Sequence, residues 1–180
     1  MYCWRITKYD PNKRDKDGFF LEESWTSFSD VGRITSGSRL TVNEYIQVEE
    51  AYIKAVEYFF EPVKDYSVEI CDFEQVDSIE EIKVIKERYF ELYPQELLCL
   101  FLKLKDGYSL CYEEIGNLCR LILREHIWGK ISFEDDDRKI FAHFGYDYYM
   151  YLGSSFNDKK VMDNIKKTGL YIEPYDSPYI

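Results

Sequence analysis

Apolar residues recur along the chain with two spacings, one typical of strands and one typical of helices. Residues 2–9 alternate, with Tyr2, Trp4 and Ile6 on one side of the backbone, which predicts a half-buried strand. Residues 67–73 alternate in the same way and predict a second strand. Further strands are expected at residues 132–134, 140–144, 148–152 and 170–173, the middle two joined as a hairpin by a turn at 145–147.

The longest helical stripe begins at Thr41, which forms a capping-box pattern with Glu44. Apolar residues then follow at spacings of three and four until Pro62, which predicts a helix over the whole segment. The opposite face is acidic, and we expect it to be solvated or to meet a basic group. The stripe is Tyr45, Val48, Tyr52, Ala55, Val56 and Phe59, and the acidic face is Glu49, Glu50, Glu57 and Glu61.

Shorter helices are predicted in the second half of the chain. One starts at another capping box, Ser78 with Glu81, and another is expected to end at Gly129. Residues 96–105 fit either a short helix or an alternating strand, and the helix is favoured because Pro94 suits a first turn. The predicted helices are residues 78–93, 110–128 and 158–167.

The remaining segments are predicted to be loops. Residues 12–18 form a charged loop or hairpin connection, and residues 25–39 form an ordered loop anchored by Trp25 and Phe28. No internal repeat or long linker interrupts the chain, so one domain over residues 1–180 is expected. Because hairpins dominate the last third, the predicted fold is α+β, with a mainly antiparallel sheet packed against several helices.

Aromatic residues make up 18% of the chain and include 17 tyrosines, more than a core of this size needs. Some tyrosines should therefore lie at the surface. Tyrosine is enriched at protein interfaces, which favours a binding face, although it also packs well at the edges of sheets.

The formal net charge of −11 narrows the choice of partners. A nucleic acid would be repelled by this field, and no concentrated basic patch is present to overcome the repulsion, so direct nucleic-acid binding is not expected. A basic protein would instead be attracted, and its association would be faster. The acidity also serves solubility, as it does in many proteins.

The sequence contains neither a long apolar run nor a secretory signal pattern, so we expect a cytoplasmic protein that does not span a membrane. Five scattered cysteines without a CxxC pair are typical of reduced thiols and make a zinc site improbable.

Catalytic patterns are absent from the sequence. Two histidines are available: His126 reads as a helix-end residue near Trp128, and His143 as a strand residue. No glycine-rich phosphate loop occurs, and the acidic run 134–137 lacks the glycine and the distal glutamate of a calcium loop. Paired carboxylates of a glycosidase cannot be recognised by spacing alone. We therefore expect no enzyme activity, catalytic residue, cofactor or metal.

Several segments together resemble a family of small bacterial immunity proteins, of the kind encoded beside contact-dependent growth inhibition and other polymorphic toxins. They cover about half of the chain and rest on aromatic and turn patterns. The segments are WRITKYDP, ESWTSFSDVG, LTVNEYIQVEEAYIKAVEYF, LREHIWGK and HFGYDYYMYLG.

The resemblance implies a stoichiometric inhibitor that binds the toxic C-terminal domain of a secreted effector and blocks its active site or its substrate surface. Such toxins are often nucleases, whose basic surface an acidic protein can occupy. Two contact regions are predicted. They are Glu134, Asp135, Asp136 and Asp137 together with Tyr146, Asp147 and Tyr148, and the tail residues Tyr175, Asp176 and Tyr179. A regulatory binding module without a toxin and a small hydrolase are the alternatives.

Overall fold

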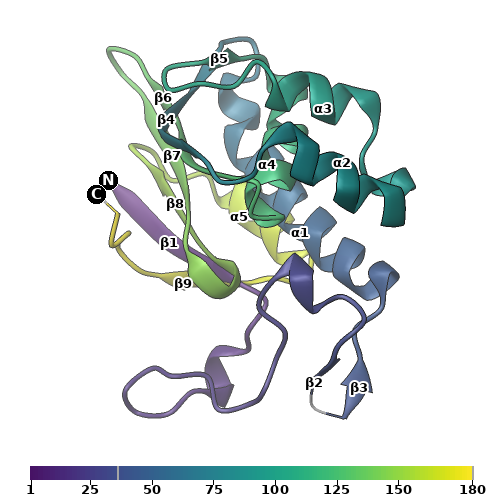
Figure 1. Ribbon diagram of the computed structural model, residues 1–180. Helices are drawn as coiled ribbons and strands as arrows, with labels where there is room; N and C mark the ends of the chain where they lie inside the picture. Colours follow the sequence, from purple (N-terminus) through teal and green to yellow (C-terminus); the bar gives the residue numbers. More distant parts are fainter. Residues whose placement is uncertain (36, 180) are drawn as a thin grey trace.

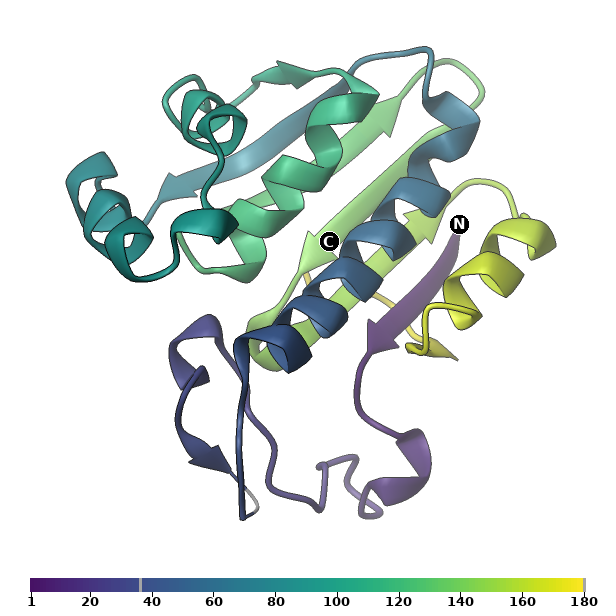
Figure 2. The same cartoon turned by 90° about the vertical axis from the view of Figure 1, so that its right-hand side faces the viewer.

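A computed structural model describes residues 1–35 and 37–179 of the chain. A seven-stranded antiparallel sheet, in the order β5-β4-β6-β7-β8-β1-β9, forms one layer, and the helices cover one of its faces (Figures 1 and 2). The α+β fold predicted from the sequence is confirmed. The strands are β1 (Tyr2–Thr7), β4 (Val68–Gln75), β5 (Ser109–Leu110), β6 (Ile127–Glu134), β7 (Lys139–Phe144), β8 (Tyr149–Ser154) and β9 (Tyr171–Pro174).

The helices follow the predicted order with altered ends. The capping boxes at Thr41 and Ser78 form as predicted, each with the glutamate three residues on. The ambiguous segment near Pro94 is helical, as favoured. The helices are α1 (Val42–Phe60), α2 (Ile79–Arg88), α3 (Gln95–Phe101), α4 (Ile115–Leu123) and α5 (Lys159–Lys166). The predicted loop 25–39 holds a short hairpin, β2 (Ile34–Thr35) with β3 (Ser38–Arg39), while Ser36 lies outside the described residues.

The helix predicted over residues 110–128 is wrong at both ends. Leu110 belongs to β5, and α4 ends at Leu123, so that Trp128 lies in β6 instead of a helix. Glu125 adopts φ 64°, and the amides of Glu125 and His126 donate to the carbonyls of Ile122 and Leu121. These bonds form a Schellman motif, whose left-handed position is usually glycine. Because Glu125 takes that position here, the sequence gives no sign of the end of the helix.

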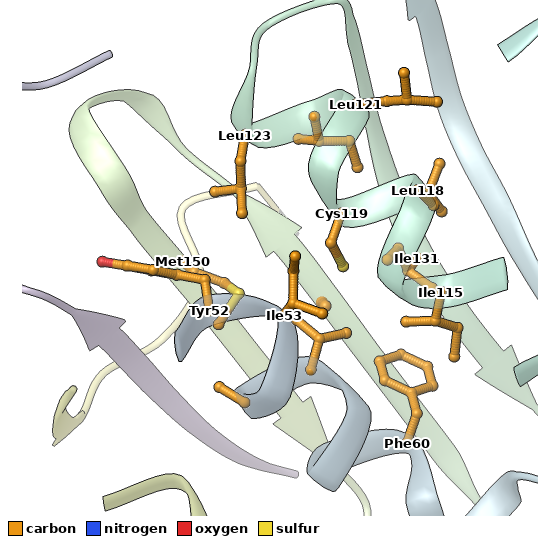
Figure 3. Close-up of a cluster of buried hydrophobic side chains, with 14 of the residues drawn as sticks. Tyr52, Ile53, Phe60, Ile115, Leu118, Cys119, Leu121, Leu123, Ile131 and Met150 are labelled. Atoms are coloured by element: carbon orange, nitrogen blue, oxygen red, sulfur yellow. The ribbon is translucent and has the colours of Figure 1, made fainter. Parts of the chain in front are cut away.

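The core lies between the helices and the covered face of the sheet. Side chains of α1 and α4 interdigitate above the central strands, with Ile53 and Leu118 facing Ile131 (Figure 3). Part of the tyrosine surplus is buried here instead of lying at the surface. Tyr45, Tyr52, Tyr93 and Tyr148 are all nearly inaccessible to solvent.

The hydroxyl groups of these buried tyrosines are paired. Tyr52 donates to the carbonyl of Tyr148 at 2.5 Å, and the Tyr148 hydroxyl donates to that of Tyr45 at 2.8 Å. Because buried polar groups are costly unless they are paired, these bonds let large amphipathic rings fill the core.

The acidic face predicted for α1 is solvated only in part. Glu49 is 1% exposed and forms an ion pair with Arg124, which follows α4. Its neighbour Glu50 pairs with Arg120 nearer the surface. The basic group that Glu49 meets therefore belongs to the protein itself.

The C-terminal tail crosses the face of the sheet that carries no helices. Ser177 lies 2.8 Å from Nδ1 of His143, and the ammonium group of Lys130 donates to the carbonyl of Tyr179 at 2.7 Å. The ring of Tyr179 packs against Tyr151. The tail thus covers part of a surface that would otherwise be open.

Candidate partner-binding surface

The first predicted contact region is divided by the structure. The acidic residues Glu134 to Asp137 form the exposed turn between β6 and β7, whereas Tyr146 and Asp147 follow the far end of β7 (Figure 1). Successive turns of an antiparallel meander lie at opposite ends of the strands, so the two groups do not form one surface. Asp135 is also engaged by Arg138 at 2.6 Å, which lowers the pKa of its carboxyl group.

An aromatic pair surrounded by carboxylates lies at the turn before β8. Tyr146 is 72% exposed, and its ring packs on Trp128 of β6 with 5.3 Å between ring centroids. Exposed carboxylates flank the pair: Glu74 is the cross-strand partner of Trp128, and Glu125 lines the same small cavity as Trp128 and Asp147. We call Glu74, Glu125, Trp128, Tyr146 and Asp147 the Tyr146 patch.

Tyr148, predicted with its two neighbours as a contact residue, does not belong to this surface. It is 6% exposed, and its ring packs against Trp25, Tyr45 and Tyr52. Its backbone turns the chain so that Tyr146 points outward while Tyr148 points into the core. The prediction of an exposed Tyr148 is therefore corrected.

Backbone strain concentrates beside the Tyr146 patch. Positive φ angles occur at Asp147 (55°), Tyr148 (61°) and Glu125 (64°), and also at Asp72 (52°) in the irregular part of β4 opposite β6. These are the non-glycine residues with positive φ in the described part of the chain. Such conformations cost about 1–3 kcal/mol each and persist where the surroundings enforce them, often at functional sites.

The carboxylates in and near the Tyr146 patch repel one another. The pKa of Glu125 is raised by partial burial and by the negative charges of Asp30, Asp147 and Asp77. A basic group placed among them would relieve this repulsion and lower the pKa of Glu125 again. The cluster of carboxylates therefore suits contact with the positively charged surface of a partner.

The residues of the second predicted contact region, the C-terminal tail, differ in their exposure to solvent. Tyr175 is 48% exposed, Asp176 is exposed, and Tyr179 is half-buried against the sheet. The hydroxyl of Tyr179 would lie 2.9 Å from a Cβ at Gly145, so the tail reaches the residue next to Tyr146. The structure therefore brings Tyr179 close to the residue before Tyr146, places Tyr175 against Arg5 and Tyr151, and leaves the acidic turn 134–137 apart from the Tyr146 patch.

A groove of about 610 Å³ lies between the N-terminal loop and strands β1 and β8. Its lining combines aromatic rings with acidic residues and one arginine. We call it the tyrosine groove. Its aromatic lining residues are Tyr9, Phe19, Phe20, Tyr149, Tyr151 and Tyr175, and its charged lining residues are Arg5, Asp17, Glu22 and Asp147.

Neither histidine lines this groove. His126 is 1% exposed, with Nδ1 2.6 Å from Asp77 and Nε2 2.8 Å from the hydroxyl of Tyr93. Desolvation lowers the pKa of His126, although the hydrogen bond and the charge of Asp77 oppose this. An aspartate, a histidine and a tyrosine in line can relay a proton, but Tyr93 is fully buried and the arrangement fixes the connection between α4 and β6.

Lys8 is the most perturbed basic group beside the groove. Burial lowers its pKa to about 7, and its ammonium group lies 3.1 Å from Oγ of Ser24 and 3.3 Å from the ring centroid of Trp25. These contacts tie the loop 24–25 to the end of β1. The amine is thus occupied in holding the wall of the groove.

No family model, curated protein or solved structure with which the chain was compared matches it. In the described residues, no group of three or more His, Cys, Asp and Glu side chains is placed to hold a metal ion. Nor does any described helix have the length and apolar character needed to cross a membrane.

Sequence reasoning missed several residues of this surface. Trp128 and Glu125 both fall inside the helix predicted over residues 110–128, which gives no sign that they lie at this surface. Arg5 and Tyr9 fall within the predicted first strand, residues 2–9. The run WRITKYDP, with its alternating arginine and aromatic residues, was the available signal for them.

Proposed function

We propose that the protein is an immunity protein, which binds the toxic C-terminal domain of a secreted effector and neutralises it by covering a basic active-site or substrate surface. The observation that carries the proposal is the Tyr146 patch, in which the exposed ring of Tyr146 packs on the half-buried Trp128 among carboxylates and beside strained backbone. Interfaces concentrate their binding energy in such central aromatic residues, with a polar rim around them.

The charge of the protein supports the same partner. A net charge of −11 attracts a basic toxin. Cationic side chains of the toxin placed between the clustered carboxylates would replace their mutual repulsion with attraction. Both imidazoles have a ring nitrogen bonded within the fold, and neither is among the residues that line the groove, which supports binding over catalysis as the mode of action.

The proposal predicts that a neighbouring gene encodes a secreted toxin, and the test uses the C-terminal domain of that toxin. Co-expression should rescue growth of cells that produce the toxin, and the purified proteins should form a stoichiometric complex. Association should slow as salt is raised from low to physiological concentration, since steering is screened over about 8–10 Å. Failure to rescue growth or to bind would reject the immunity function.

Matched variants locate the contact surface. Tyr146→Ala should weaken binding by about 30-fold or more, the effect of losing a residue at the centre of an interface. Tyr66→Ala is the control, because Tyr66 is 52% exposed and packs near Arg138 at the other end of the sheet. Equal losses in the two variants would exclude the Tyr146 patch as the contact.

Charge reversal separates the two acidic regions. The double variant Glu125→Lys with Asp147→Lys should slow association strongly, whereas Asp136→Lys with Asp137→Lys should slow it only through the change in net charge. If the second pair had the larger effect, the turn between β6 and β7 would be the contact instead.

A further inference from the structure

The tyrosine groove adjoins the Tyr146 patch. Asp147 belongs to the patch and also lines the groove. Thr26 and Tyr149 line both the groove and the small cavity that Trp128 helps to line. A toxin that covers the Tyr146 patch therefore has part of its own surface next to the groove.

Two exposed aromatic rings of the groove come from opposite ends of the chain. Phe19, in the loop that follows β1, is 71% exposed, and Tyr175, in the C-terminal tail, is 48% exposed. Phe20 and Tyr149 add half-buried rings to the same lining. Aromatic rings that are gathered in a groove and left open to water are typical of a contact surface.

The charges of the lining favour a cation over an anion. Among the described residues that line the groove, Arg5 is the one base, and it is 14% exposed and paired with Glu173 at 3.1 Å. Three carboxylates share the lining with it. They belong to Asp17, Glu22 and Asp147.

Two of these carboxylates have no ion pair with any described residue. Glu22 pairs with Lys13 at 2.9 Å, whereas Asp17 and Asp147 lack such a partner. Asp147 acts on Lys8 electrostatically, because its charge opposes the lowering of the pKa of Lys8, but it forms no ion pair with it. The groove therefore offers negative charge that a cationic side chain from outside can neutralise.

The protein already places one guanidinium group against rings of this groove. The guanidinium carbon of Arg5 lies 4.3 Å from the ring centroid of Tyr175 and 5.6 Å from that of Tyr149, while Nε and Nη2 donate to Glu173. Stacking on a ring combined with pairing to a carboxylate is an arrangement that arginine favours. A second guanidinium, brought by a partner, would meet the same two kinds of group, exposed rings and carboxylates without an ion pair.

We propose that the tyrosine groove binds an arginine-bearing segment of the toxin, beside the part of the toxin that covers the Tyr146 patch. This inference rests on the proposed function and adds a second part to the same interface. Arginine suits the groove better than lysine, because its planar guanidinium group stacks on rings and pairs with carboxylates through two hydrogen bonds. The volume of about 610 Å³ is enough for a short segment of chain.

A synthetic peptide tests the chemistry of the groove without the toxin. The probe is an acetylated and amidated alanine pentapeptide with one central arginine, and its control carries citrulline, which keeps the shape of arginine and lacks its charge. In NMR titrations of the full chain, the arginine peptide should bind at least about tenfold more tightly and shift the amide signals of Phe19 and Tyr175. Equal affinities, no binding of the arginine peptide, or shifts confined to another surface overturn the proposal.

A single residue distinguishes a toxin segment from a small cation. N-acetyl-arginine amide presents the guanidinium group without the flanking chain. Tighter binding of the pentapeptide supports a polypeptide in the groove. Equal affinity of the two probes would assign the groove to a small guanidinium compound and would contradict the proposal.

Asp17→Asn removes one carboxylate of the groove. Asp17 is exposed and has no ion pair among the described residues, so the fold should be unaffected. The variant should weaken binding of the arginine peptide about threefold to tenfold and leave binding of the citrulline peptide unchanged. Asp137→Asn, in the turn between β6 and β7, changes the net charge equally and is the control. Equal effects of the two variants would show that net charge acts and the groove does not.

Phe19→Ala removes an exposed ring of the groove. It should weaken binding of the arginine peptide about threefold to tenfold, the effect of losing one exposed cation–π contact. Phe90→Ala is the matched control, because Phe90 is 72% exposed and does not line the groove. Unchanged affinity in Phe19→Ala would contradict the proposal.

The toxin complex separates failure of this inference from failure of the immunity function. A wild type that neither rescues growth nor binds the toxin rejects the immunity function. If the wild type binds, the double variant Asp17→Asn with Phe19→Ala should weaken the complex about tenfold or more. Full affinity of the double variant, together with a loss in Tyr146→Ala, would retain the immunity function and exclude the groove from the interface.

Discussion

The carboxylate of Glu49 accepts two hydrogen bonds from the guanidinium group of Arg124, from Nε and from Nη2, each at 2.7 Å. The two side chains are 1% and 2% exposed, so this ion pair joins α1 to the end of α4 inside the protein. Arg124 also donates to the carbonyl of Leu92. The pair thereby fixes three segments that are distant in sequence.

Glu49→Gln should therefore destabilise the protein by about 3–5 kcal/mol, because it leaves a buried guanidinium without a counter-charge. Chemical denaturation of the variant gives this free energy of unfolding directly. Glu50→Gln, one residue along the same helix, should cost less than about 1 kcal/mol, since its pair with Arg120 is partly solvated. Similar losses in the two variants would show that burial of the first pair has no energetic weight.

His143 should make the protein less stable in weak acid. Desolvation, with a smaller contribution from Lys130, lowers its pKa from 6.5 to about 4. As the pH falls from 6.5 to 4, the unfolded chain binds the proton first, so the stability that is present above pH 6.5 is lost progressively.

The measurement is the free energy of unfolding of the wild type minus that of His143→Gln, taken at each pH. This difference should fall by up to about 3 kcal/mol between pH 6.5 and pH 4, while the titration of the carboxylates largely cancels. A difference that stays constant with pH would contradict the lowered pKa.

The features that the sequence predicted well are encoded by neighbouring residues. The capping box of Thr41 with Glu44 and the apolar spacing of α1 involve contacts within a few residues, so they are readable without the fold. The burial of Glu49 could not be predicted, because its partner Arg124 lies 75 residues away in the sequence. The local pattern places Glu49 on the acidic face of the helix and does not reveal the arginine with which it pairs.

The candidate surface was predictable to the same extent. Tyr146 and Asp147 stand out as an aromatic and acidic turn, and the structure exposes both. Strand β7 runs between this turn and the turn that contains Glu134, so its length separates the two. Predicting that separation requires β6, β7 and β8 to be recognised as consecutive strands of a meander. Trp128 joins Tyr146 only through the sheet, after the helix has ended earlier than expected.

Gly153 should not tolerate a side chain. It is the cross-strand partner of Phe141, whose ring covers it so closely that a Cβ would lie 2.1 Å from the nearest ring atom. Gly153→Ala should cost about 1–3 kcal/mol, because the ring must move within a packed sheet.

Gly116→Ala is the matched comparison in thermal unfolding. The added Cβ would lie 3.0 Å from the end of the flexible Glu57 side chain, which can move aside. Since alanine favours a helix over glycine by about 1 kcal/mol, this variant should gain stability or remain neutral. Equal destabilisation of the two variants would mean that the close approach of Phe141 does not set the cost.

Glu125 should lower the stability of the free protein and strengthen its binding to a basic toxin. It occupies the left-handed position of the Schellman ending of α4, where glycine fits without strain, and its pKa is raised by burial and by neighbouring carboxylates. Glu125→Gly should therefore raise the free energy of unfolding by about 1 kcal/mol. Under the proposed function, the same change should weaken binding of a basic toxin, because a carboxylate leaves the Tyr146 patch.

Glu125→Gln separates the two effects, since it removes the charge and keeps a side chain in the strained conformation. It should lose affinity as the glycine variant does and gain less stability than that variant. A glycine variant that is less stable than the wild type would show that the surroundings favour the strained residue. A glutamine variant with full affinity would show that its carboxylate takes no part in the contact.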